Sequence, residues 1–272
     1  MRRRWLRSIL PVTRPMDLYD TIGVNYRQRR RPDPRIAARI AAALEGCATV
    51  LNVGAGAGSY EPQDRRVVAV EPSTVMIRQR PANAAPVVRA SAAALPFGTD
   101  SFDACLAVLT MHHWPDPWRG LAELRRVARL RVVVLTCDPS IAPFWLYDYF
   151  PELLTIDRHI LPPLSVWRRQ VPALQVVGVP IPHDCSDGFL GAYWRRPEAY
   201  LEAEVRAAIS TFSKLRRVEA GVEALRRDLA SGAWRARYDH RVQQDELDLG
   251  YRLLVVGPPF PGGGGPGNPQ LG

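Results

Sequence analysis

Three glycines at alternate positions follow a short apolar run early in the sequence. Residues 49–60 read TVLNVGAGAGSY, with glycine at positions 54, 56 and 58. Glycine tolerates the positive φ angles of tight turns and lets a ligand approach the backbone closely. Nicotinamide-binding loops place their third glycine one residue later, where this chain has Ser59, and no Gly-Lys-Ser/Thr follows to form a phosphate loop. The spacing therefore favours an adenosyl ligand that has no pyrophosphate, with a purely structural turn as the alternative.

A carboxylate ends the next apolar run. Glu71 closes the segment RVVAVE and stands 17 residues after Gly54. A carboxylate at the end of the second strand of an α/β sheet can accept hydrogen bonds from both hydroxyls of a ribose. The position and the chemistry of Glu71 agree with the adenosyl ligand that the glycines favour.

These residues need a parallel sheet to bring them together. Strand and helix patterns alternate along the chain, which is typical of a parallel sheet wrapped by helices. The pattern predicts helices over residues 35–44 and 117–129, and strands over the following ranges: 49–54, 66–71, 86–90, 102–110, 131–137, 174–181 and 251–257. In such a sheet the ligand lies beyond the carboxyl ends of the strands, near the first strand.

Four segments in order resemble a known family. VLNVGAGAGSY, VVAVEPS, the stretch from Ala90 to Arg129 and RVVVLTCDP are similar to successive motifs of the class I S-adenosylmethionine-dependent methyltransferases. Within this group, the methyltransferase 11 domain family is the most similar, typified by the ubiquinone and menaquinone biosynthesis C-methyltransferases. The resemblance covers residues 49–138. It implies an α/β fold with a Rossmann-like seven-stranded sheet, an antiparallel last strand, helices on both faces and a helical lid insertion.

The resemblance also implies the cofactor, S-adenosyl-L-methionine, and the residues that bind it. Carried over by position, the cofactor-binding residues are Asn52, Gly54, Ala55, Gly56, Gly58, Glu71, Pro72, Ser91, Ala92, Leu109, Thr110 and Met111. Two positions depart from the family pattern, because Asn52 and Ser91 stand where the family has acids. Both keep a hydrogen-bonding side chain but lose a charge. A non-catalytic or regulatory relative that only binds the cofactor is therefore an alternative to an active enzyme.

Histidines are the candidate catalytic residues for the implied methyl transfer to a small organic acceptor at O, N or C. Such a transfer depends mainly on holding the acceptor in line with the methyl group, and a base helps when the acceptor must lose a proton. His112 and His113 follow the fourth predicted strand, whose end faces the methyl group. His113 is our first candidate base, with packing and capping of the next turn as the alternative. His183, which follows the sixth strand beside Asp184, is a further candidate.

Aromatic residues after position 139 suggest an acceptor pocket. Residues 143–152 and 182–200 are rich in rings, which suit a planar or hydrophobic acceptor. A satellite core beneath a lid is the alternative. The candidate substrate-binding residues are Tyr19, Tyr26, Trp145, Tyr149, Asp184, Tyr193 and Trp194. Tyr19 and Tyr26 belong to a segment that resembles the family's N-terminal lid helix, although their spacing fits simple packing equally well.

The positive charge of the chain is concentrated at its start. The formal net charge is +9, and residues 1–39 hold eleven arginines against three acids. We expect a solvated basic arm, because no stacking aromatics share a defined face with these arginines. Nucleic acid is therefore not an expected partner. A nucleic-acid methyltransferase and an NAD-dependent oxidoreductase stay as further alternatives.

Composition and cysteine spacing limit the possible domain organisation and cellular location of the protein. The four cysteines lie far apart and without metal-ligand spacing, so we expect buried reduced thiols, no metal site and a cytoplasmic protein. No apolar stretch approaches a membrane span. We expect a disordered basic extension over residues 1–15 and a disordered Gly/Pro tail over 258–272. Between them, one methyltransferase domain would span 16–257, with a cofactor half at about 34–138 and an acceptor and lid region at about 139–250.

Overall fold

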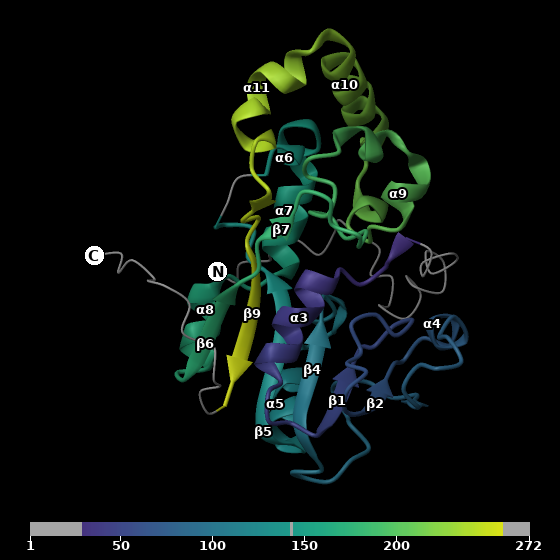
Figure 1. Ribbon diagram of the computed structural model, residues 1–272, viewed down its shortest axis with the longest axis vertical. Coiled ribbons are helices and arrows are strands. Elements are labelled where there is room, and N and C mark those ends of the chain that lie inside the picture. The colour runs from purple at the N-terminus through teal and green to yellow at the C-terminus, as the bar shows by residue number, and fades with distance from the viewer. Residues whose placement is uncertain (1–28, 142–143, 258–272) are drawn as a thin grey trace, which may run out of the picture.

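A computed structural model describes residues 29–141 and 144–257 of the chain (Figure 1). Its strands are β1 (Thr49–Val53), β2 (Arg66–Val70), β3 (Val87–Val88), β4 (Phe102–Val108), β5 (Ala128–Cys137), β6 (Leu174–Gly178), β7 (Ile181–Pro182), β8 (Glu246–Leu247) and β9 (Tyr251–Val256). Its α-helices are α3 (Pro34–Ala43), α4 (Thr74–Arg78), α5 (Pro117–Val127), α6 (Leu146–Tyr149), α7 (Pro151–Ile160), α8 (Leu164–Gln170), α9 (Ala203–Ala207), α10 (Val218–Ser231) and α11 (Ala233–Val242). Short 3-10 helices are η1 (Met111–His113), η2 (Pro197–Leu201) and η3 (Phe212–Lys214).

The seven-stranded sheet has the order β3-β2-β1-β4-β5-β9-β6. Strands β1 to β5 pair in parallel, and β9 runs antiparallel between β5 and β6. This arrangement confirms the predicted α/β sheet with an antiparallel last strand. The chain order reverses between β1 and β4, which is where ligands bind in open α/β sheets. The fold therefore brings the glycine turn and the end of β4 to the same crevice.

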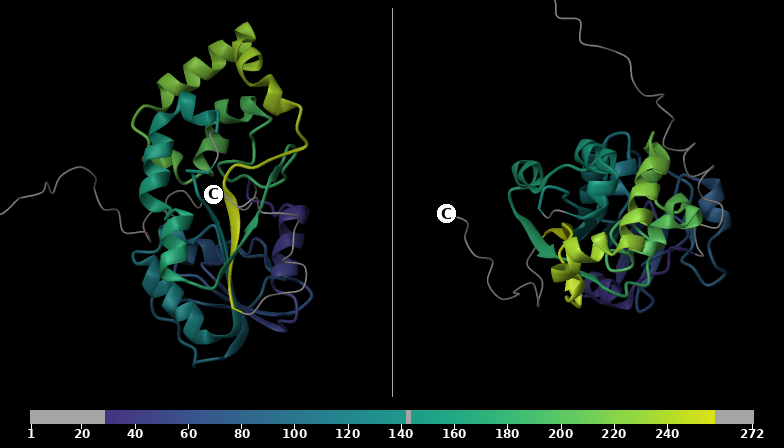
Figure 2. Two further views of the ribbon diagram at one scale, coloured as in Figure 1. Left: turned by 90° about the vertical axis from the view of Figure 1, so that its left-hand side faces the viewer. Right: turned by 90° about the horizontal axis from the view of Figure 1, so that it is seen from above.

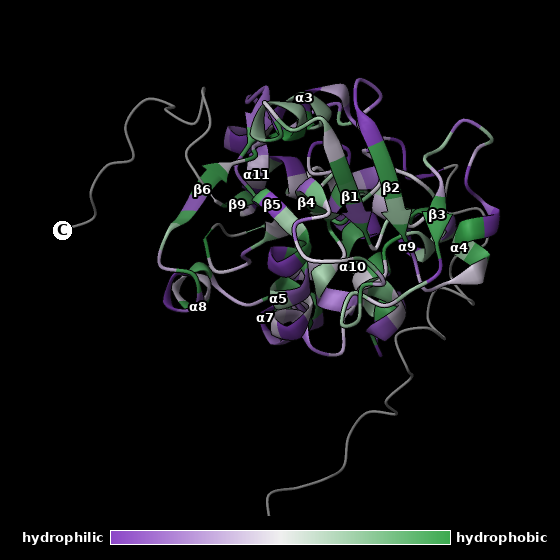
Figure 3. Ribbon diagram, turned by 90° about the horizontal axis from the view of Figure 1, so that it is seen from below, coloured by the Kyte–Doolittle hydropathy of each residue, from purple (hydrophilic) through white to green (hydrophobic). Residues whose placement is uncertain are grey.

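The central strands are buried on both faces. All but the first residue of β1, and all but the two end residues of β4, are buried, as expected for parallel strands covered by helices on either side. Figure 3 shows hydrophobic colouring along the strands, whereas α5 and α7 carry hydrophilic segments beside hydrophobic ones. One buried cluster joins α3 and the upper helices to one face of the sheet, and a second joins α5 and α8 to the other face.

Local sequence signals set the ends of the two helices that cover the cofactor half. The side chain of Asp33 caps α3 and that of Asp116 caps α5, each followed directly by a proline at the first helical position. An acidic N-cap accepts the free backbone N–H groups of the first turn, and proline lacks the N–H that would be unpaired there. Leu121 and Leu124 of α5 are buried in the cluster that packs against the sheet.

We call helices α6, α7, η2, α9, η3, α10 and α11, with residues 183–202, the cap. Figures 1 and 2 show the cap above the carboxyl ends of the parallel strands. Its interior is built from large aromatic side chains, and Trp145, Trp194 and Tyr200 are fully buried. The cap confirms the predicted helical lid insertion, and it encloses the space above the end of β4.

The seven predicted strands are all present, with different ends. The sixth strand is shorter than predicted, because β6 ends at Gly178 and residues 181–182 pair instead with 246–247 in a separate small ribbon. The four cysteines are free thiols; Cys137 is partly buried and the others are buried. In the described part of the chain, no helix has both the length and the apolar character needed to cross a membrane. The predictions for residues 1–15 and 258–272 lie outside the described residues.

Candidate functional site

A cavity of about 300 Å³ lies beyond the carboxyl ends of β1, β2 and β4. Eight of the predicted cofactor-binding residues line it: Gly54, Gly56, Glu71, Pro72, Ser91, Ala92, Leu109 and Thr110. Met76, His113 and Trp114 complete much of the remaining wall. Asn52, Ala55, Gly58 and Met111 do not line it. The structure therefore brings most of the predicted set together around one space, which we call the cofactor cavity.

The glycine turn requires its glycines for two reasons. Gly54 and Gly56 have φ angles of 71° and 53°, in the left-handed region that favours glycine. A Cβ atom on Gly54 would also come within 2.1 Å of the Thr110 hydroxyl oxygen. The backbone N–H of Gly54 donates to the carbonyl of Val70, at 2.8 Å, which fixes the turn to the end of β2. Close packing and backbone geometry together hold the turn open toward the cavity.

Glu71 lies at the centre of this arrangement. Its carboxylate accepts a hydrogen bond from the Gly56 N–H at 2.8 Å and another from the Ser73 N–H at 2.9 Å. Burial raises the pKa of Glu71 above its ordinary value, while these two backbone donors act in the opposite direction. Each carboxylate oxygen has more than one lone pair, so both can still accept from a ligand's hydroxyls. Glu71 can thus hold a ribose while it also ties the glycine turn to β2.

The lining of the cofactor cavity fits S-adenosylmethionine. Its volume lies at the lower end of the range of about 300–1,000 Å³ that is usual for ligand pockets. Among the described residues, no lysine or arginine lines it, and Glu71 would repel a pyrophosphate. The backbone of Gly54 and Gly56 would hold the methionine portion of the cofactor. Glu71 would bind the ribose, and the adenine would lie beside Ser91 and Ala92. Nothing in this set requires a metal, and residues 29–141 and 144–257 contain no cluster of metal-binding side chains.

A second, smaller cavity of about 70 Å³ lies between the cap and the sheet. We call it the acceptor cavity. It shares Leu109 and His113 with the cofactor cavity, so the two spaces meet at the carboxyl end of β4. Leu109 has a φ angle of 48°, which is uncommon for a residue other than glycine and is a form of backbone strain found at functional sites. The chain turns sharply at this residue, between β4 and η1.

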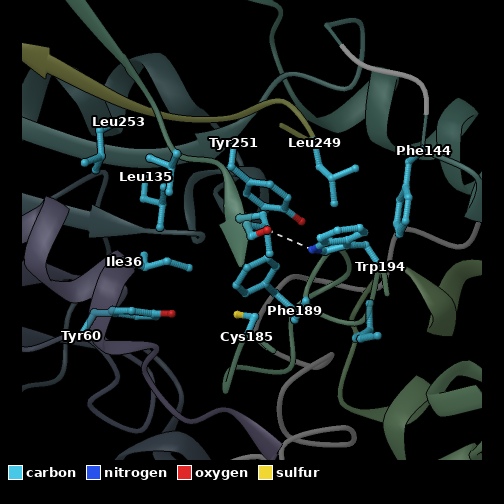
Figure 4. Packing of buried hydrophobic residues seen from close by; sticks show 14 of the residues in the cluster. Ile36, Tyr60, Leu135, Phe144, Cys185, Phe189, Trp194, Leu249, Tyr251 and Leu253 are labelled. Carbon is cyan, nitrogen blue, oxygen red and sulfur yellow. Dashed lines mark hydrogen bonds between the residues drawn. The ribbon is translucent and has the colours of Figure 1, made fainter. Parts of the chain in front are cut away.

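Aromatic rings form much of the acceptor cavity, and three of the four come from the two ring-rich segments that the sequence singled out, although they are not the individual residues named as candidates there. Phe144, Tyr147, Phe189 and Tyr251 line it. Figure 4 shows Phe144, Phe189 and Tyr251 within one cluster, and the rings of Phe189 and Tyr251 are 4.8 Å apart. The fourth, Tyr251, lies at the start of β9, 51 residues beyond the end of the second of these segments at residue 200.

The described aromatic residues that the sequence named as candidates pack within the cap. Trp145 and Trp194 are buried in the core of the cap, where the indole N–H of Trp145 donates to the carbonyl of Trp194 at 2.8 Å. The hydroxyl of Tyr149 donates to Asp228, at 2.8 Å, and the ring of Tyr193 contacts the Arg196 guanidinium. None of these four aromatic residues lines the acceptor cavity, and their contacts fit the alternative of a satellite core. Tyr19 and Tyr26 lie outside the described residues.

His112 and His113 both line the acceptor cavity, and their rings are 3.9 Å apart. Burial lowers the pKa of His112 to about 3, and burial together with the neighbouring His112 lowers the pKa of His113 well below its ordinary value. Nearby Lys214 and Arg30 act in the same direction. Both imidazoles are therefore neutral at neutral pH. They can accept hydrogen bonds, but they are weak bases because their protonated forms are unstable.

His183 and Asp184 lie elsewhere. The ring Nδ1 of His183 contacts the carbonyl of Asp245 at 3.0 Å, and the Asp184 carboxylate pairs with Arg35 at 2.7 Å. Neither residue lines either cavity, because the chain after β6 leaves the sheet and pairs with β8. The structure thus separates this predicted acid–base pair from the site.

Asp157 is a lining residue that sequence reasoning missed. It lies on α7, is only 4% exposed, and accepts a hydrogen bond from the Tyr147 hydroxyl at 3.4 Å. Burial raises its pKa to about 6. Within the described residues it has no ion pair shorter than 4 Å, since Lys214 acts on it only at longer range. The available signal was an acid within the buried stripe of a helix, four residues after the buried Leu153.

Comparisons with known proteins agree with this geometry. A family model described as a methyltransferase domain matches residues 51–135. A crystal structure from Anabaena variabilis, described as a methyltransferase from an antibiotic biosynthesis pathway, is 35% identical. It superposes with a TM-score of 0.79 over 84% of this chain and 99% of that chain.

Curated relatives match over shorter stretches. The 2-methyl-6-phytyl-1,4-hydroquinone methyltransferase 2 of Oryza sativa is 37% identical over 67 residues, which are 25% of this chain and 19% of that protein. An uncharacterised methyltransferase of Mycobacterium sp. strain JLS is 40% identical over 106 residues, which are 36% of this chain and 42% of that protein. The matches thus span less than half of these relatives. Together with the sheet topology and the Anabaena structure, they show that the chain belongs to the class I S-adenosylmethionine-dependent methyltransferases.

Proposed function

We propose that this enzyme transfers the methyl group of S-adenosylmethionine to a small organic acceptor bound in the acceptor cavity. The observation that carries the proposal is the shared wall, because Leu109 and His113 line both cavities. The cofactor, when bound, supplies a methyl group on a positively charged sulfur. The protein has to place an acceptor atom beside that group and keep water away, and these two tasks account for most of the rate in such displacements.

The rings of the acceptor cavity suit the second task. Phe144, Phe189 and Leu161 offer apolar surface, and the cap covers the cavity. A cavity of about 70 Å³ is smaller than a typical ligand site, so we propose a small planar acceptor and some outward movement of the cap on binding. The names of the plant and cyanobacterial relatives are consistent with organic acceptors, but whether O, N or C is methylated stays open in this proposal.

Asp157 and His113 have different roles in this proposal. General bases act best when their pKa lies near the working pH. The carboxyl of Asp157, with a pKa of about 6, meets this condition better than His113, whose pKa is well below its ordinary value. We therefore propose Asp157 as the group that accepts a proton or a hydrogen bond from the acceptor. His113, at the junction of the cavities, orients the acceptor through its neutral ring, and its role as base stays an untested prediction.

The division of the chain into a cofactor half at 34–138 and an acceptor and cap region at 139–250 is likewise a proposal. It is supported by the lining of the cofactor cavity, which comes from residues 54–115. The acceptor cavity draws most of its wall from residues beyond 137. A cytoplasmic location and the absence of a nucleic-acid partner stay predictions from composition.

Calorimetric titration tests the proposal. We expect S-adenosylhomocysteine to bind at one site and NAD not to bind. Gly56→Val should abolish binding, because it fills the turn and forces a β-branched residue to a φ angle of 53°. Gly178→Val is the matched control, since a Cβ at Gly178 would meet nothing within 4 Å. Binding of NAD without S-adenosylhomocysteine, or normal binding by Gly56→Val, would refute the proposed cofactor site.

Turnover is tested next with a panel of small phenols, amines and acidic carbon compounds, with S-adenosylhomocysteine formation as the readout. Product formation with at least one class, and its loss in Gly56→Val, supports methyl transfer. Tight cofactor binding without turnover across the panel would instead favour the regulatory relative that the sequence left open.

A further inference from the structure

A buried ion pair lies behind the glycine turn. One guanidinium nitrogen of Arg80 lies 2.7 and 2.9 Å from the two carboxylate oxygens of Glu61. The side chains are 4% and 1% exposed. Neither residue lines the cofactor cavity or the acceptor cavity, and neither belongs to the motifs that the family resemblance uses.

The ion pair reaches the cofactor cavity through Gly56. The other terminal nitrogen of Arg80 donates to the Gly56 carbonyl at 3.3 Å. The N–H of the same glycine donates to Glu71 at 2.8 Å. Both backbone polar groups of Gly56 are thus held by charged side chains, one of which lies on the cavity and one behind it. A guanidinium has several donors in a fixed plane, so Arg80 can hold Glu61 and Gly56 at once.

Asn52 completes the network. Its side-chain N–H donates to Glu61 at 3.3 Å, and Asn52 is 1% exposed. The family resemblance expects an acid at position 52. In this chain an acid there would lie against the carboxylate of Glu61. Across the described residues, Arg80 is the only cation within 4 Å of Glu61, and one cation would have to balance two buried carboxylates.

Stability alone does not explain the ion pair. A buried salt bridge recovers little more than the cost of removing its charges from water, and a well-packed apolar pair would stabilise the fold as well. A buried charged network can instead serve to hold the surrounding backbone in one geometry. Here the network fixes two segments against each other: the turn at Gly56, and the loop at Ala85, whose carbonyl accepts from Arg80 at 2.8 Å and whose N–H donates to Glu61 at 3.1 Å.

We propose that Glu61 and Arg80 are positioning residues for the cofactor: Arg80 holds the carbonyl of Gly56, and Glu61 fixes Arg80 and supplies the negative charge that the family resemblance expects at residue 52. The inference rests on the proposed placement of S-adenosylmethionine beside Gly56. In this proposal the neutral Asn52 replaces the acid that the family resemblance expects at position 52, and Glu61 supplies the carboxylate of the network.

The first test uses Arg80→Lys. A lysine keeps the positive charge beside Glu61 but has no planar fork, so it cannot also hold Gly56. We expect the variant to fold and to bind S-adenosylhomocysteine roughly 5- to 20-fold more weakly, the effect of one lost hydrogen bond. Arg78→Lys on the exposed end of α4 is the matched control, with unchanged affinity expected. A folded Arg80→Lys protein with wild-type affinity would overturn the proposal.

The second test moves the charge back. Asn52→Asp alone should weaken binding, because it sets two buried carboxylates side by side. Glu61→Gln alone should also weaken it, because it leaves Arg80 without a counter-charge. The double variant Asn52→Asp/Glu61→Gln restores one acid and one cation, so it should bind more tightly than either single variant. If the losses of affinity in the two single variants add up in the double variant, the proposal that Glu61 supplies the charge expected at position 52 is wrong.

The outcomes separate this inference from the proposed function. Wild-type binding of S-adenosylhomocysteine that is lost in Gly56→Val, combined with normal affinity in Arg80→Lys, would leave the proposed cofactor site standing and refute the positioning role. Failure of the wild-type protein to bind S-adenosylhomocysteine would refute both. Melting temperatures of all variants show whether an affinity change occurs in a folded protein.

Discussion

Replacing Asp157 by Asn should make the protein more stable at neutral pH. Asp157 is 4% exposed on α7, and burial raises its pKa from 3.8 to about 6. The folded state then binds this proton more tightly than the unfolded chain does. Between about pH 4 and pH 6 the unfolded chain is ionised while the folded protein keeps the proton, so stability falls as the pH rises through this window. Asparagine has nearly the same shape and no proton to lose.

The size of the effect follows from the two pKa values. The difference between 3.8 and about 6 corresponds to about 3 kcal/mol, at about 1.4 kcal/mol for each pH unit. The wild-type protein loses this amount between about pH 4 and pH 7, and Asp157→Asn does not. For a chain of this size the gain in melting temperature at neutral pH is about 6–12 °C. The variant should also lose turnover, because the Asp157 carboxylate, whose ionisation destabilises the fold, is the group proposed to act on the acceptor.

Urea unfolding of both proteins at about pH 4.5 and at about pH 7.5 measures the effect. From the two pKa values we expect the variant to be more stable by about 1 kcal/mol at the lower pH and by about 3 kcal/mol at the higher pH. Asp239→Asn is the control, because Asp239 is an exposed acid on α11 whose ion pair with Arg235 is worth less than about 1 kcal/mol. A pH-independent difference, or a variant that is less stable at about pH 7.5, would refute the reasoning and assign Asp157 a structural role.

Three further changes test the cofactor cavity and the base. Gly54→Ala should lower both the melting temperature and the affinity for S-adenosylhomocysteine, because its Cβ would lie 2.1 Å from the Thr110 hydroxyl; an unchanged melting temperature would mean that the turn relaxes freely. Glu71→Ala should weaken binding by about 1–3 kcal/mol and speed amide exchange in the glycine turn, and normal affinity in calorimetry would remove Glu71 from the site. If His113 rather than Asp157 is the base, His113→Ala should slow turnover by ~10²- to 10⁴-fold, with His183→Ala as the control; a small loss in both would withdraw the assignment of His113.

Much of the cofactor half follows from local sequence. The apolar runs that became β1 and β2 are long enough and continuous enough to be recognised as buried strands. The glycines after β1 are needed for positive φ angles, and Glu71 ends the strand beside it. Strand length and register fix where such residues lie, so their positions along the chain predict their meeting in space.

The network behind the turn was only partly visible in the sequence. Asn52 stood out as a departure from the family pattern. Glu61 and Arg80, its proposed partners in the network, did not stand out, because Glu61 lies in an irregular loop and Arg80 follows a five-residue helix. Neither segment has a periodic pattern that fixes the direction of a side chain, and only the packed structure shows Asn52 and Glu61 in contact.

The sequence by itself determined the fold class and the approximate positions of the seven strands, because these depend on repeating backbone geometry, and its resemblance to the family identified most of the residues that line the cofactor cavity. The tertiary structure alone decided which residues of the cap line the acceptor cavity. It buried Trp145 and Trp194 in the core and brought Asp157 from α7 and Tyr251 from β9 to the cavity beside His113. The cap consists of short helices and loops, whose side chains take their directions from long-range packing, and composition carries no record of that packing.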